Sequence, residues 1–161
     1  MEEPLLVIGV GNLYRRDDGA GIAVVRKLNE LNLWGITTRD ESGEGSSLIE
    51  AWRGASRVMI VDAVSSGSVP GTIHRFDALC QPVPADFFHH SSHSFGVAEA
   101  IEVARALDAL PGQLEILGIE GREFTSGPGL SPEVERAVDK AAALVAREFH
   151  LNAKHDRLAF Q

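Results

Sequence analysis

The chain has 161 residues, 44% of them hydrophobic, so it can bury a full core and is not composed like a disordered protein. Its net charge of -8 argues against nucleic acid as the main partner, because phosphate contacts need clustered lysine and arginine. A single cysteine, Cys80, excludes an intrachain disulfide, and the lack of a long apolar run or basic leader indicates a cytoplasmic protein that does not enter a membrane.

Strand and helix patterns alternate through the first half of the chain. The helix after Asp18 places Ile22, Val25 and Leu28 on one apolar stripe. The elements expected here are a buried strand at 5–8, that helix, a weak edge strand at 36–39, a short helix through Trp52 capped by Ser46 or Ser47, and a buried strand at 57–61 that ends on Asp62.

The second half continues the alternation. We expect a half-exposed strand at 72–76, an irregular stretch at 81–93, a helix that begins near Val97, a strand at 114–119, and a helix that starts at Ser131-Pro132. Residues 1–149 then form a single domain, and residues 150–161 a flexible C-terminal tail. This pattern predicts an α/β fold of three layers, α/β/α, with a twisted, mostly parallel sheet of the phosphorylase/hydrolase-like kind.

Ligands of such folds gather at the carboxyl ends of the strands. Asn12, Asp17 and Asp18 follow the first strand, and Asp62 ends the second buried strand. Gly9-Val10-Gly11 suggests a phosphate-binding turn, but Tyr14 occupies the place of the third glycine, and two carboxylates would repel a phosphate. Helix capping accounts for one of these carboxylates, so we expect the turn to present the other.

Three histidines, His89, His90 and His93, fall within five positions. A lone histidine is more often structural than a ligand, and Asp62 could simply hold its own loop. His93 is the stronger candidate because it stands just before Gly96, where a helix begins. If Asp18, Asp62 and His93 converge, they form a carboxylate–imidazole site suited to nickel, zinc, manganese or iron.

The stretch from Gly9 to Gly21 resembles the signature of the nickel–iron hydrogenase maturation proteases. The resemblance continues, in order, through Ile60-Val61-Asp62-Ala63, Pro70-Gly71-Thr72, Ser92-His93-Ser94-Phe95-Gly96, Leu117-Gly118-Ile119 and Gly129-Leu130-Ser131-Pro132. It implies an endopeptidase that removes a C-terminal extension from the precursor of the hydrogenase large subunit.

The resemblance also implies roles for particular residues. The acids and the histidine with which the family contacts metal fall on Asp18, Asp62 and His93, which would recognise nickel already inserted in the precursor. The substrate would then bring the nickel, and another divalent metal could bind the isolated protein. Apart from the resemblance, we expect Asp17 to orient the turn after the first strand and Asn12 to belong to the same substrate-side loop. A monomer is expected, since the partner is engaged transiently.

One loop departs from the family pattern. Where the family reads close to Asp-Gly-Gly-Thr, this chain has Glu41-Ser42-Gly43-Glu44-Gly45. Gly43 and Gly45 keep the backbone freedom of a substrate-contacting loop, but the polar side chains differ.

Two other functions fit parts of the pattern. A peptidyl-tRNA hydrolase would need a histidine near Asp18 and a basic face, and a non-catalytic escort that senses metal in the immature subunit would use the same three residues.

Overall fold

A computed structural model describes residues 3–88 and 90–159, with side chains up to residue 150. The described strands are β1 (Leu5–Val10), β2 (Ile36–Glu41), β3 (Arg57–Val64), β4 (Ile73–Asp77) and β5 (Gln113–Glu120). The α-helices are α1 (Ala20–Leu31), α2 (Gly45–Trp52), α3 (Val97–Ala106) and α4 (Pro132–Ala159), and two short 3-10 helices are η1 (Arg16–Gly19) and η2 (Ala85–Phe88).

The strands form one sheet in the order β2-β1-β3-β5-β4. All neighbours are parallel except β4, which pairs antiparallel with β5 at one edge. The chain passes from β1 to β2 on one side, and from β2 it crosses back over β1 to β3 on the other side. The strand order therefore reverses between β1 and β3, and in open α/β sheets such a reversal opens a crevice for ligands.

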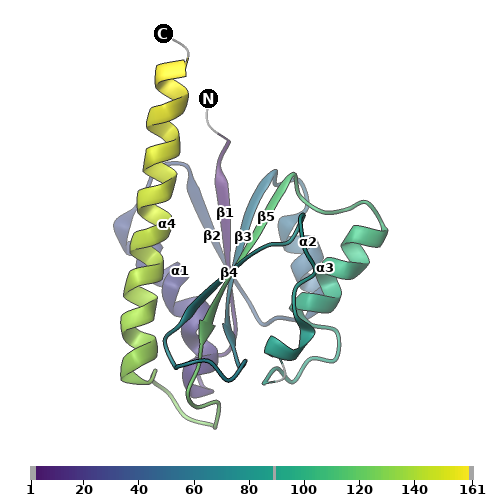
Figure 1. The fold of residues 1–161 in the computed structure, drawn as a ribbon, viewed down its shortest axis with the longest axis vertical. Helices are drawn as coiled ribbons and strands as arrows, with labels where there is room; N and C mark the ends of the chain where they lie inside the picture. Colours follow the sequence, from purple (N-terminus) through teal and green to yellow (C-terminus); the bar gives the residue numbers. More distant parts are fainter. Residues whose placement is uncertain (1–2, 89, 160–161) are drawn as a thin grey trace.

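Two helical layers cover the sheet, α1 with α4 on one face and α2 with α3 on the other (Figure 1). Alternate residues of β1 supply the two cores: Leu5 and Val7 face α1 and α4, whereas Ile8 and Val10 face α2 and α3. This arrangement confirms the α/β/α sandwich and its mostly parallel sheet. In the described part of the chain, no helix combines the length and apolar character needed to span a bilayer.

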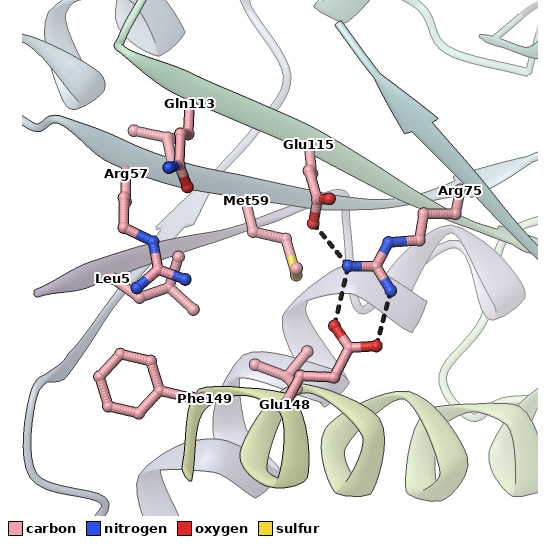
Figure 2. Close-up of a pocket in the computed structure, with 10 residues that line it drawn as sticks. Leu5, Arg57, Met59, Arg75, Gln113, Glu115, Glu148 and Phe149 are labelled. Atoms are coloured by element: carbon pink, nitrogen blue, oxygen red, sulfur yellow. Dashed lines mark hydrogen bonds and ion pairs between the residues drawn. The ribbon is translucent and has the colours of Figure 1, made fainter. Parts of the chain in front are cut away.

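The long helix α4 is fastened to the sheet at its amino edge, far from the crevice. Arg75 of β4 donates two hydrogen bonds of 2.8 Å to Glu148 of α4 and one of 2.8 Å to Glu115 of β5 (Figure 2). These residues border a cavity of about 150 Å³ whose wall also holds Leu5 and Phe149. Because the guanidinium is already bonded to two carboxylates, we assign this network to anchoring α4.

Several expected elements differ in their limits, three of them with a consequence for named residues. β3 continues to Val64, so Asp62 lies inside the strand instead of at its end. Glu44 caps α2 in place of Ser46 or Ser47, and the hydrogen bonds that these serines donate lower the pKa of Glu44 to about 2. α4 does not stop near residue 149 but continues to Ala159, because loss of the apolar stripe does not remove helix-favouring residues.

Candidate metal centre at the carboxyl edge of the sheet

A cavity of about 270 Å³ opens where the strand order reverses. Its walls come from the turn after β1, the start of α1, the loop after β2, the inner part of β3, and the irregular segment before α3. The lining includes Tyr14, Arg15, Asp18, Asp62, His90 and His93. The carboxyl-edge location expected from the sequence is therefore where the polar side chains gather.

Two glycines let helix α1 start close to the ends of β1 and β3. A Cβ on Gly21 would lie 2.1 Å from the backbone oxygen of Val61, so only glycine allows this contact. Gly11 has a φ of +142°, and a Cβ there would lie 1.8 Å from the oxygen of Asp18. The glycines thus bring the start of the helix, and Asp18 with it, against β3. They do not form a phosphate cradle.

Asp18, Asp62 and His90 each direct one metal-binding atom to a common point. These three atoms lie within 4.8 Å of one another, and the residues are the one such group in the part of the chain that the structure describes. Nε2 of His90 is 3.3 Å from Oδ1 of Asp18 but is not aligned for a hydrogen bond. The group lies deep in the protein, with Asp62 3% and the His90 side chain 3% exposed.

The group has the electrostatics of a cation site. Oδ1 of Asp62 and both ring nitrogens of His90 are buried without a hydrogen-bond partner, which is costly unless something else occupies them. Burial, and next the negative charge of Asp18, raise the pKa of Asp62 well above its usual value. A divalent cation would relieve both penalties, and carboxylate with imidazole is a donor set that nickel and zinc accept.

His93 lines the same cavity, although its ring is not part of the close group. It lies near Gly43, since a Cβ on that glycine would be 3.7 Å from Cδ2 of His93. Gly45 donates its backbone N–H to the oxygen of Phe95 at 2.8 Å, so the glycine loop packs on the histidine segment. His89 lies outside the described residues.

His90 is held in place by two residues that the sequence patterns did not single out. Its ring stacks on Phe124, with centroids 4.3 Å apart and planes 23° apart. Arg15 donates a hydrogen bond of 3.0 Å to the backbone oxygen of His90. The spacing of the three histidines could not have selected His90, because its neighbours come from distant loops.

The side-chain oxygens of Asp17 and Asn12 both accept hydrogen bonds from other residues of the protein. Asp17 is fully buried and accepts hydrogen bonds from the backbone N–H groups of Arg122, Glu123 and Ser131 and from the Ser131 hydroxyl, at 2.7–2.9 Å. Asn12 accepts the N–H of Tyr14 at 2.9 Å. Asp17 therefore ties the turn after β1 to the loop that carries Phe124, and Asn12 braces the turn itself.

Asp62→Asn is expected to raise the Tm of the metal-free protein at pH 8 by about 2–4 °C, which for a domain of this size is about 1 kcal/mol. The raised pKa means that the fold favours the protonated carboxyl, so Asp62 costs stability as pH rises through that pKa. The gain should shrink toward pH 5. Thermal unfolding with a chelator, with exposed Glu30→Gln as control, measures it; a lower Tm for Asp62→Asn at pH 8 would contradict the interpretation.

The chain is similar to known proteins over most of its length. Residues 22–148 match the family model described as hydrogenase maturation protease. A Methanocaldococcus jannaschii protein named as a candidate hydrogenase maturation protease is 32% identical, over 91% of this chain and 97% of its own. The hydrogenase 2 maturation protease of Escherichia coli is 28% identical, over 85% of each chain.

Solved structures share the fold. The hydrogenase maturating endopeptidase HybD of E. coli superposes with a TM-score of 0.77 and 23% identity, over 92% of this chain and 93% of that one. An endopeptidase from E. coli solved in solution gives a TM-score of 0.76 with 27% identity, over 88% of this chain and 89% of that one.

Proposed function

This chain belongs to the hydrogenase maturation protease family and is a hydrogenase maturation endopeptidase, and we propose that it cuts the C-terminal extension from the precursor of a nickel–iron hydrogenase large subunit after nickel insertion. The observation that carries the proposal is the buried group of Asp18, Asp62 and an imidazole, whose unpartnered atoms suit a cation. The nickel belongs to the precursor, which brings it to the cavity. In the isolated protein another divalent metal can take the same donors.

The reaction consumes one water and converts a peptide bond into a carboxylate and an amine. When bound there, a divalent metal would supply a Lewis acid for the scissile carbonyl or for the attacking water. Asp18 and Asp62 hold their oxygens in a buried pocket, where they can orient that water and accept its proton. The imidazole completes the donor set. Recognition of the metal and hydrolysis of the peptide bond thus use the same carboxylates and imidazole.

The site explains why processing would wait for nickel. Without a cation, burial and next the negative charge of Asp18 raise the pKa of Asp62, so the pair resists carrying two charges. A precursor that lacks nickel therefore meets a site whose donors have nothing to bind. A nickel-loaded precursor supplies the missing charge, so its C-terminal segment is held long enough to be cut.

The two histidines can be separated by metal binding. His90→Ala is expected to weaken nickel binding to the isolated protein at least tenfold, because it removes a donor from the close group, whereas His93→Ala should change it less than threefold. Both should slow processing, since both side chains line the cavity. Calorimetric titration measures the affinities. The opposite ranking would return the ligand role to His93, as the family resemblance implies.

Intact-mass analysis of a candidate precursor tests the function directly. Incubation with this protein should remove one C-terminal segment from the nickel-loaded precursor and leave the nickel-free precursor unchanged. Stable binding of the loaded precursor without any mass change would instead favour the escort function. We propose that the protein works in the cytoplasm as a monomer that engages the precursor transiently, without nucleic acid or membrane, and gel filtration checks the monomer.

A further inference from the structure

We propose that Tyr14 is the docking residue for the peptide substrate, and that its ring packs against an apolar side chain of the extended segment that carries the scissile bond. The inference rests on the proposed function, since it concerns the same cavity. It adds a recognition element that neither contacts metal nor takes part in bond cleavage.

The first observation is that Tyr14 is exposed to solvent at the rim of the cavity. It is 76% exposed, although aromatic side chains usually bury a large part of their surface. Other exposed apolar residues exist, among them Trp34 at 80% and Leu107 at 71%. Of the large exposed hydrophobic residues that the structure describes, Tyr14 is the one that borders the cavity with Asp18 and Asp62.

The second observation is that the backbone beneath the ring is fixed. The N–H of Tyr14 donates to the side chain of Asn12 at 2.9 Å, and its oxygen accepts the N–H of Gly127 at 2.8 Å. The N–H of Arg16 donates to the oxygen of Gly127 at 2.9 Å, which continues this pairing. An exposed ring on a braced turn loses little backbone entropy when a partner covers it, which is the condition for a strong binding residue.

The third observation is that the cavity is small compared with the substrate. A cavity of about 270 Å³ with buried carboxylates can take the scissile bond and a few neighbouring atoms, but not a folded domain. The rest of the substrate segment must therefore cross the rim, where Tyr14 stands. Covering an aromatic ring stabilises a complex through apolar contact, and the phenol hydroxyl stays free to reach water. An extended segment with an apolar residue beside the cleavage point fits this rim.

Steady-state processing kinetics with a nickel-loaded precursor test the inference. Tyr14→Ala should raise KM about tenfold with kcat within twofold, because it removes binding that is equal in the ground and transition states. Tyr14→Phe should keep the wild-type KM within twofold. Trp34→Ala is the matched control: Trp34 is as exposed but precedes β2 at the amino edge, away from the cavity, so its KM should not change.

Several outcomes would overturn the inference. They are an unchanged KM for Tyr14→Ala, an equal rise for Trp34→Ala, and a parallel loss of nickel affinity in the isolated Tyr14→Ala protein, which would show that the substitution acts through the turn. If the wild-type protein does not cut the precursor, the proposed function fails on its own. The same three variants are then compared by their Kd for the loaded precursor, where a tenfold loss confined to Tyr14→Ala still supports the docking role.

Discussion

Asp18→Asn is expected to slow precursor processing by about 10²–10³-fold while the protein stays folded. The substitution keeps the size of the side chain but removes one of the two carboxylates that would hold the metal. Metal stabilisation of charge in a transition state contributes several kcal/mol, and about 1.4 kcal/mol corresponds to a factor of ten in rate. Losing one of the two anionic donors should therefore lower the processing rate by about 10²–10³-fold. Rates from intact-mass time courses measure the effect.

The stability of this variant separates a functional loss from a folding defect. Burial and next the charge of Asp18 raise the pKa of Asp62, and the amide removes that second cause, so it should leave the Tm unchanged or slightly higher. Asp108→Asn, at an exposed aspartate remote from the cavity, serves as the control and should process at the wild-type rate. Processing by Asp18→Asn within tenfold of wild type would remove Asp18 from the metal centre.

Most of the fold could be predicted because it follows from patterns along the chain. Short apolar runs marked β1, β3 and β5, and the apolar stripe of α1 marked a surface helix. A general rule on parallel sheets predicts a ligand site at their carboxyl edge, and the cavity that Asp18 and Asp62 line lies at that edge. These are local or topological inferences, and they need no knowledge of which side chains touch.

The choice among the histidines could not be predicted in the same way. His90 and His93 lie in one irregular segment without a helical or strand period, so spacing does not say which ring turns inward. The close group takes His90 because Phe124 stacks on its ring and Arg15 holds its backbone oxygen. Both supports come from loops distant in the sequence, so they emerge only with the tertiary structure.

The hydrogen-bond partners of Asp17 could not be predicted from the sequence either. A carboxylate in front of a helix usually indicates a cap, and the pattern here predicts one. In the structure no side-chain cap is made at the start of η1 or α1, and Asp17 instead bonds residues more than 100 positions away. A sequence pattern predicts that the carboxylate will find N–H donors, but it does not identify a loop more than 100 residues later in the chain.

Asp17→Ala is accordingly expected to be the most destabilising substitution proposed here, at about 3–5 kcal/mol. It removes the acceptor of four hydrogen bonds and leaves the N–H groups of Arg122, Glu123 and Ser131 without their partner. An unpaired buried donor costs about 1–3 kcal/mol, and whole domains are stable by only about 5–15 kcal/mol. Urea unfolding should show a much lower midpoint with a similar slope.

Two milder substitutions, Ser131→Ala and Asp17→Asn, should cause graded losses of stability. Ser131→Ala removes one of the four hydrogen bonds and should cost about 1 kcal/mol, and Asp17→Asn should fall between it and Asp17→Ala, because the amide accepts at one oxygen only. Hydrogen exchange should quicken first in the loop of residues 121–131. Since that loop carries Phe124, which stacks on His90, nickel affinity should fall in the same order as stability. If Asp17→Ala lost less than about 1 kcal/mol, or weakened the fold without touching nickel affinity, the buried carboxylate would not be the link between this loop and the metal centre.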